Sequence, residues 1–135
     1  DEGLTIRADV TETPGSQGVG YLVILHGGSL ADRIAMLTTR AAVSTRVTRD
    51  GSETFTTAAG VNTNARYSAI LGVKTGGGSL VVTGGSPAAG APVPPPYLGS
   101  FEIGSFNASL PLKGVIHRLT FWRGRLSESL VGSLL

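Results

Sequence analysis

The segment LKGVIHRLTFWRGRLS, residues 112–127, decides how the rest of the sequence is interpreted. Its middle alternates apolar and polar side chains with the period of two that a β-strand requires, which predicts a strand from about Gly114 to Arg123. Ile116 has the opposite parity to Leu119 and Phe121. All three can face one core only if a β-bulge shifts the register between Ile116 and Leu119.

The same alternation recurs upstream in short runs that are separated by turn residues. Residues 4–11 alternate strictly and predict a strand with one solvated face, whereas residues 21–25 are apolar throughout and predict a strand covered on both faces. Asp50 and Gly51 both tolerate positive φ and mark a tight hairpin turn. Further strand-like runs lie at 34–38, 43–47, 53–57, 65–73, 80–82 and 101–103.

Together these runs predict an all-β sandwich in a single domain over residues 1–135. We expect about nine to eleven short strands, because the runs follow one another without intervening helices. Ser127 is a favourable N-cap, so a short helix should close the chain over 128–135. Five of the seven prolines fall in 86–96, and prolines cannot donate to a strand ladder. This stretch is expected to be a stiff surface connection between the sheets.

The composition narrows the classes of partner. The 135 residues include no cysteine, which excludes a disulfide framework and a thiolate zinc site. The formal net charge is only +2 and the basic residues are spread along the chain, so nucleic acid is not an expected partner. The longest apolar run, 19–25, is far shorter than the roughly 20 residues of a membrane span, and no membrane insertion is expected. The chain begins at Asp1 rather than Met, which suggests processing or a longer parent chain.

The sequence offers no recognisable catalytic constellation. His26 and His117 each lie in a strand-like run, where a structural role is the simpler account, and no Gly-x-Ser-x-Gly elbow accompanies them. Two pairs of acids are closely spaced, and both pairs flank turns: Asp9 with Glu12, and Asp50 with Glu53. Neither pair has the spacing of two glycosidase carboxylates on one strand face, so we expect that the chain is not an enzyme.

No cofactor or metal is expected either. The possible oxygen ligands for calcium form no Asp-x-Asp or Asp-x-Asn cluster; they are Asp9, Asp32, Asp50 and Asn107. The candidates for carbohydrate contact are Trp122, Arg123 and Arg125, because a sugar ring can stack on an indole and guanidinium groups bind acidic glycans. The structural alternative is a polar strand face whose arginines cover apolar surface and reach water.

The motif Leu-x-Gly-x-Ile-x-x-Leu-x-Phe-Trp-x-x-Arg-Leu-Ser at 112–127 closely resembles the last strand and closing turn of concanavalin A-like lectin/glucanase (laminin G-like) domains. It is most similar to those at the C-termini of tailed-bacteriophage virion proteins. Residues 101–105 and 2–5 resemble the preceding and opening strands of that family, and 65–67 with 80–82 resemble its middle hairpin. The resemblance implies an antiparallel two-sheet jelly-roll sandwich whose framework positions are Gly114, Ile116, Leu119, Phe121, Trp122 and Leu126. The proline-rich stretch departs from the family pattern.

The resemblance also implies a function. We expect a non-catalytic bacteriophage virion module, a lectin-like domain of a tail fibre, tail spike or head fibre that adsorbs to host-surface carbohydrate. Its partners are then other virion proteins and a host-surface glycan, its location is the virion, and its assembly is a homo-oligomer, expected to be a trimer. The alternative is a capsid decoration or cement protein that stabilises the head and binds no glycan. A third hypothesis, a glycan-cleaving enzyme, requires a close pair of carboxylates in a cleft.

Overall fold

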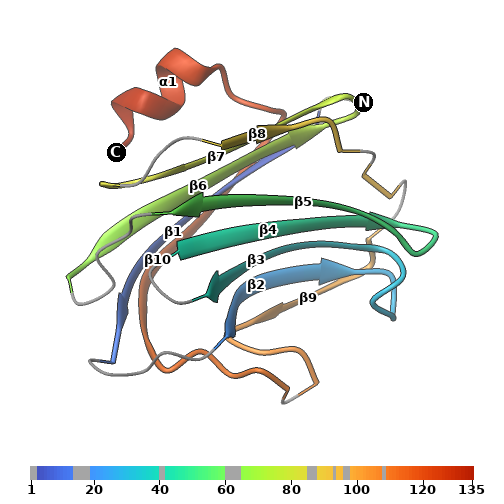
Figure 1. Ribbon diagram of the computed structural model, residues 1–135, viewed down its shortest axis with the longest axis horizontal. Helices are drawn as coiled ribbons and strands as arrows, with labels where there is room; N and C mark the ends of the chain where they lie inside the picture. Colours follow the sequence, from blue (N-terminus) through green and yellow to red (C-terminus); the bar gives the residue numbers. More distant parts are fainter. Residues whose placement is uncertain are drawn as a thin grey trace.

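Two antiparallel β-sheets pack face to face, and a short helix follows the last strand (Figure 1). The computed structural model describes residues 3–13, 19–39, 42–59, 65–84, 88–92, 94–95, 98–107 and 109–135, with the backbone alone for 55–59. Sheet A has the strand order β10-β1-β6-β7-β8, and sheet B has the order β5-β4-β3-β2-β9. The expected all-β sandwich with a C-terminal helix is confirmed.

Except for β8, the strands correspond to the runs expected from the alternation. In sheet order, sheet A contains β10 (Gly114–Arg123), β1 (Leu4–Glu12), β6 (Tyr67–Lys74), β7 (Gly77–Val82) and β8 (Ala88–Gly90). Sheet B contains β5 (Ser52–Ala59), β4 (Ala42–Arg49), β3 (Arg33–Thr39), β2 (Gly20–His26) and β9 (Ser100–Ile103). The helix α1 is Glu128–Ser133.

The first and last strands of the chain lie side by side in sheet A, and their pairing contains the expected bulge. Asp9 of β1 lies opposite Arg118 of β10, but the next residue, Val10, lies opposite Ile116. His117 is therefore the extra residue in β10. Because of this shift, Ile116 and Leu119 both pack against the core although their parities differ.

Phe121 lies on the inner face with Ile116 and Leu119, because it is opposite the buried Ile6, but it stays partly exposed. Its side chain is 40% exposed, and its ring centroid lies 6.0 Å from that of Phe101 in β9. The reason is the position of its strand: β10 and β9 are edge strands of their sheets, and β9 has only four residues. A strand this short leaves the side of the sandwich partly open.

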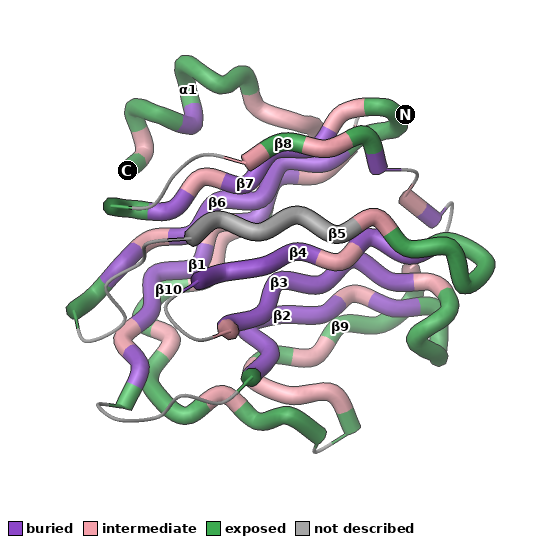
Figure 2. The backbone as a smooth tube through the Cα atoms, in the orientation of Figure 1, coloured by how far each residue is buried: buried purple, intermediate pink, exposed green. Residues whose placement is uncertain are grey.

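The core fills the space between the sheets with inward-facing apolar side chains from both. Figure 2 shows the buried residues in purple along the strands of the two sheets. Its buried members are Ile6, Ala8, Val10, Leu22, Val23, Ile34, Met36, Val43, Val47, Tyr67, Ala69, Leu71, Val73, Leu80 and Val82. They recur at alternate positions along each strand, because successive side chains point to opposite faces. The β2 bulge between Tyr21 and Val23 is the exception and brings Leu22 and Val23 to the core together.

The proline-rich stretch is only partly the connection that we expected. Residues 88–90 pair with β7 as the short edge strand β8. Pro92, two residues after the end of β8, is buried, and its carbonyl accepts a hydrogen bond of 3.0 Å from the Gly76 amide. The Pro92 ring occupies the space beside Gly78: a Cβ atom added to Gly78 would lie only 2.9 Å from Pro92 Cγ. Edge strands tolerate neighbouring prolines, so this placement agrees with the chemistry of the residue.

The expected hairpin turn at Asp50-Gly51 and the expected helix cap at Ser127 are both confirmed. Asp50 and Gly51 have φ angles of 49° and 79° and form the hairpin between β4 and β5. The Ser127 hydroxyl accepts a 3.3 Å hydrogen bond from the Leu130 amide and so caps α1. The helix is six residues long and buries Val131. No helix in the described ranges is long and apolar enough to cross a membrane.

Candidate functional site

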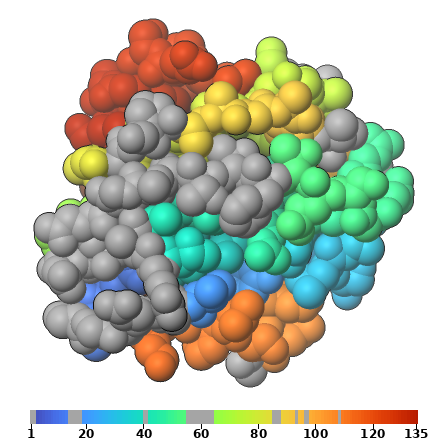
Figure 3. Space-filling model, in the orientation of Figure 1, coloured from blue at the N-terminus to red at the C-terminus, as the bar shows by residue number. Residues whose placement is uncertain are grey.

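A row of polar side chains crosses the outer face of sheet B, which is turned toward the viewer in Figure 3. The row follows from the strand registers: Ser100 lies opposite His26, His26 opposite Arg33, Arg33 opposite Thr48, and Thr48 opposite Glu53. Directly opposed residues have Cβ atoms about 4.5–5.5 Å apart and point to the same face. The five strands of sheet B thus each contribute one polar residue to the row.

Arg33 is the centre of this row and is only 5% exposed. Its Nη2 donates to Glu53 Oε2 at 2.7 Å and its Nε donates to Thr48 Oγ1 at 3.2 Å. Its Nη1 donates to the Tyr21 hydroxyl at 3.1 Å. Three strands are therefore tied to β3 through one guanidinium group, whose rigid planar donors suit such a junction.

A second interaction on the same face joins β2 to the edge strand β9. His26 Nε2 lies 3.0 Å from Glu102 Oε2, and Glu102 Oε1 accepts a 2.9 Å hydrogen bond from the Asn107 amide. The Gly28 amide donates to the other nitrogen of the ring, His26 Nδ1, at 3.0 Å. His26 Nε2 must then carry the proton and donate to Glu102, because Nδ1 is already an acceptor.

Aromatic side chains lie beside these polar groups. The Phe106 ring meets the His26 ring at 5.1 Å and 84°, and the Tyr21 ring at 6.4 Å and 63°. Phe106 also packs on a small apolar cluster of the outer face, which consists of Tyr21, Ile24, Ala35 and Leu37. Strand β2 is therefore covered on both faces, as its uninterrupted apolar run predicts.

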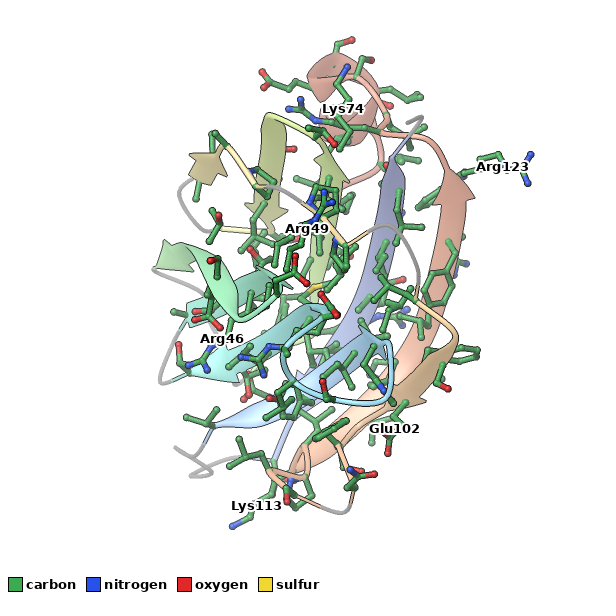
Figure 4. The ribbon with its side chains drawn as sticks, turned by 90° about the vertical axis from the view of Figure 1, so that its right-hand side faces the viewer. Arg46, Arg49, Lys74, Glu102, Lys113 and Arg123 are labelled. Carbon is green, nitrogen blue, oxygen red and sulfur yellow. The ribbon has the colours of Figure 1, made fainter. Side chains whose placement is uncertain are left out.

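The partly exposed groups on this face can bind through hydrogen bonds. The side chains of Arg46, Glu53 and Glu102 are 37%, 33% and 31% exposed. Arg46 Nε lies 3.9 Å from Glu53 Oε1, and Figure 4 shows Arg46 on the outer side of sheet B. Charged donors and acceptors next to an aromatic ring are the combination that sugar rings with many hydroxyl groups require.

The two acids of this face are too far apart to act as a glycosidase pair. Glu53 and Glu102 lie on β5 and β9, the opposite edges of sheet B. Four strand spacings separate these edges by about 19 Å. The two carboxylates of a glycosidase lie about 5–10 Å apart. The arrangement therefore suits binding better than hydrolysis.

The sugar-contact candidates from the sequence lie on or next to sheet A, away from the polar row of sheet B. Trp122 lies opposite Thr5 in sheet A and is half-buried, while its neighbour Arg123 projects into solvent (Figure 4). Arg125 packs against Gly72 and Gly77 of sheet A, and its Nη2 lies 3.8 Å from Glu128 Oε1. Trp122 and Arg125 share the outer face of sheet A, because Thr5 lies opposite both Trp122 and Gly72 and Arg125 covers Gly72. Arg123 points to the other side of β10, and contact of any of the three with a sugar stays a prediction.

Of the four oxygen ligands considered for calcium, only Asp32 and Asp50 meet. Asp9 lies in sheet A, whereas Asp32 Oδ1 accepts a 2.9 Å hydrogen bond from the Asp50 amide at the β4–β5 hairpin. Asn107 follows β9. Within the described residues no group of three or more His, Asp or Glu side chains could hold a metal ion.

A buried carboxyl group lies inside the sandwich, between the sheets. Glu12 is 6% exposed and accepts a 3.1 Å hydrogen bond from the Tyr67 hydroxyl. Burial raises the pKa of Glu12 above its ordinary 4.5, and hydrogen bonds from Tyr67 and Thr38 only partly offset this. Because its folded-state pKa is the higher one, the stability that Glu12 contributes is fully present below pH 4.5 and is lost as the pH rises through the folded-state value.

The Glu12→Gln substitution should therefore stabilise the protein at neutral pH. We expect a gain of about 1 kcal/mol at pH 7, since the amide keeps an acceptor for Tyr67 without a buried charge. The gain should vanish below pH 4.5, which urea unfolding at a series of pH values would show.

Asp9→Asn is the matched control, for which we expect the opposite effect on stability. Burial alone would raise the pKa of Asp9. The opposing effects are larger and bring the pKa below its ordinary 3.8: hydrogen bonds from Ser68 and Arg7, and the positive charges of Arg7 and Arg66. Its stability contribution is present above pH 3.8 and is lost below it, so Asp9→Asn should destabilise the protein at neutral pH.

No family model and no curated protein matches the sequence. Among solved structures, a Ruminococcus gnavus IT-sialidase CBM40 bound to α2,6-sialyllactose aligns with a TM-score of 0.79 at 18% identity, over 98% of this chain and 82% of that one. Mouse laminin α1 domains LG4-5 align at a TM-score of 0.66 and 15% identity, over 90% of this chain and 36% of that one. Sheep galectin-11 in complex with glycerol aligns with a TM-score of 0.55 at 10% identity, over 90% of this chain and 91% of that one.

The chain has the concanavalin A-like jelly-roll fold. At identities this low the likeness establishes the fold and leaves the function to the site. The fold that the C-terminal motif implied is thus confirmed.

The sequence did not reveal the row on sheet B. Arg33, Glu53 and Glu102 were each one polar residue among many, and His26 was given a structural role. One signal pointed to this face: the apolar run 21–25 requires cover on the outer side of β2. What covers it, Phe106, lies more than 80 positions further along the chain.

Proposed function

We propose that this chain is a non-catalytic carbohydrate-binding domain whose glycan lies on the outer face of sheet B. The observation that carries the proposal is the polar row centred on Arg33, which ends at the partly exposed Glu53 and has Arg46, Glu102 and the Phe106 ring beside it. The described cations and carboxylates of this face balance, which favours recognition of hydroxyl groups over recognition of a strongly acidic ligand. The likeness in fold to a CBM40 bound to sialyllactose supports a carbohydrate as the ligand class.

The finer form of the proposal places the domain on a bacteriophage virion. In this form the domain belongs to a tail fibre, tail spike or head fibre, and it adsorbs to host-surface glycan as part of a trimer. The resemblance of 112–127 to phage virion modules supports it. Repeated copies on a particle raise the overall binding strength through effective concentration, so each domain needs only a weak affinity for the glycan.

Removal of Arg46 tests the proposed face. We expect Arg46→Ala to weaken binding about tenfold on a panel of neutral and sialylated glycans, since one charge-assisted hydrogen bond is worth about 1.5–3 kcal/mol. The protein should be displayed multivalently so that weak binding is measured. Lys74→Ala is the matched control, because it removes an exposed positive charge at the end of β6 in sheet A. Equal glycan binding by both variants would show that sheet B is not the site.

A purely structural function, capsid decoration without glycan binding, is favoured by one observation. The open side of the sandwich exposes Phe101, Ile103 and Phe121 to 61%, 51% and 40%. Large apolar side chains gathered at one exposed edge are typical of a protein contact. Gold-labelled antibody on purified virions separates the two functions. Label on the tail tip or fibres supports adsorption, and label spread over the capsid supports decoration.

A further inference from the structure

A basic cluster lies on the outer face of sheet A, on the other side of the molecule from the proposed glycan face. Its centre is Asp9 of β1, whose side chain is 3% exposed. Three guanidinium groups surround this carboxylate: Arg7 Nε lies 2.9 Å from Oδ1, Arg66 Nη2 lies 3.7 Å from Oδ2, and Arg118 Nε lies 3.9 Å from Oδ2. Three segments that are distant in the sequence therefore bring one positive charge each to a single carboxylate.

The β10 bulge adds a fourth basic group to this cluster. His117 Nε2 lies 2.9 Å from Thr11 Oγ1, and Arg118 approaches Asp9. Thr11 and Asp9 are two positions apart in β1 and so share the outer face. The bulge thus turns two successive basic side chains, His117 and Arg118, toward the same face, which a regular strand cannot do.

Two of the arginines are not needed to satisfy Asp9. Oδ1 already accepts a 2.5 Å hydrogen bond from the Ser68 hydroxyl and a 2.9 Å hydrogen bond from Arg7. Arg66 and Arg118 lie beyond hydrogen-bond distance, and their side chains are 58% and 61% exposed. Exposed pairs of this kind contribute little to stability. Both arginines thus lie within 4 Å of the same oxygen, Asp9 Oδ2, while more than half of each side chain is exposed to solvent.

The charges of the cluster match a dianion. Asp9 offsets one of the three arginine charges, which leaves an excess of two positive charges before any protonation of His117. A phosphate group carries nearly two negative charges at neutral pH and has several strong acceptor oxygens. Guanidinium groups recognise it through paired hydrogen bonds.

We infer that the cluster of Arg7, Arg66, His117 and Arg118 around Asp9 is a binding site for a phosphate group. Arg66 and Arg118 contact the phosphate directly through their exposed donors. Arg7 and Asp9 hold the position of the site, and His117 supplies a further donor at its edge. The phosphate can be free in solution or can be carried on a glycan, and the recognition chemistry is the same for both.

The test is a titration of the intact chain, followed by NMR, with inorganic phosphate at constant ionic strength. We expect saturable shifts of the Ser68 and Arg118 amides and about tenfold weaker binding in the double variant Arg66→Ala/Arg118→Ala. Both side chains are largely exposed, so this variant should fold. The double variant Arg49→Ala/Lys74→Ala is the control, since it removes two exposed charges elsewhere and should bind phosphate as the unmodified chain does.

Two further ligands, glucose 6-phosphate and glucose, identify the source of the phosphate. Glucose 6-phosphate that binds more tightly than inorganic phosphate, with no shifts from glucose, supports a glycan-borne phosphate. Equal binding of the two phosphates supports a free phosphate ion. The inference is overturned if phosphate gives no saturable shifts, or if both double variants lose affinity equally. Binding of a DNA duplex far more tightly than either phosphate, with a steep salt dependence, would also overturn it in favour of a nucleic-acid surface.

Discussion

Arg33→Ala should lower the stability of the domain by about 3 kcal/mol, the order expected when one partner of a buried, hydrogen-bonded ion pair is removed. The truncation leaves the buried Tyr21 hydroxyl without its 3.1 Å donor and Glu53 without its 2.7 Å partner. It also releases Thr48. For a chain of this length the midpoint of thermal unfolding should fall by about 10 °C. Chemical unfolding in guanidinium chloride measures the loss directly.

Two further variants separate the role of Arg33 from a general effect of charge. Arg49→Ala removes a guanidinium whose side chain is 45% exposed, and it should change stability by less than about 0.5 kcal/mol. Arg33→Lys keeps the charge but cannot hold three partners, so its stability should lie between that of Arg33→Ala and the unmodified chain. If Arg33→Ala were as stable as Arg49→Ala, the hydrogen-bond network would not organise sheet B.

Gly114→Ala should destabilise the domain by about 2–3 kcal/mol, as overpacking against backbone does. Gly114 lies opposite Glu12 at the start of β10. A Cβ atom there would overlap the carbonyl oxygen of Thr11 and lie 2.7 Å from the Glu12 Cα atom. Both neighbours are backbone of β1, which cannot move aside without breaking the β1–β10 pairing. Urea unfolding of the purified variant measures the effect.

Gly132→Ala is the matched control for Gly114→Ala. Gly132 lies within α1, and a Cβ atom there meets nothing within 4 Å. Alanine favours a helix by about 0.5–1 kcal/mol over glycine, so this variant should be as stable as the unmodified chain or slightly more stable. A loss of stability that is equal in the two variants would contradict the close approach at Gly114.

Strand positions were predictable because their information is local. The alternation in residues 4–11 gave a strand with the right inward set, Ile6, Ala8 and Val10. The parity change between Ile116 and Leu119 predicted the bulge at His117. Alternation places Phe121 on the inner face, where it lies opposite Ile6. It says nothing about how far the opposite sheet extends, so the partial exposure of Phe121 was not predictable.

The candidate sites could not be read from the sequence in the same way. His26 and Glu102 are 76 positions apart, and Arg66 reaches Asp9 across 57 positions. No local pattern states that β9 pairs with β2, or that β1 lies between β10 and β6. The basic residues of the C-terminal segment suggested one stripe, but Trp122 and Arg123 point to opposite sides because successive residues of a strand alternate.

The sequence by itself determined the all-β class, the positions of most strands, the β4–β5 hairpin and the helix cap, since each depends on residues within one short segment. The tertiary structure alone decided which polar side chains meet. Arg33 became the centre of a network because β2, β4 and β5 bring Tyr21, Thr48 and Glu53 to it. Periodicity fixes the face on which a side chain lies, and the order and register of strands, set by packing of the whole core, fix its neighbours.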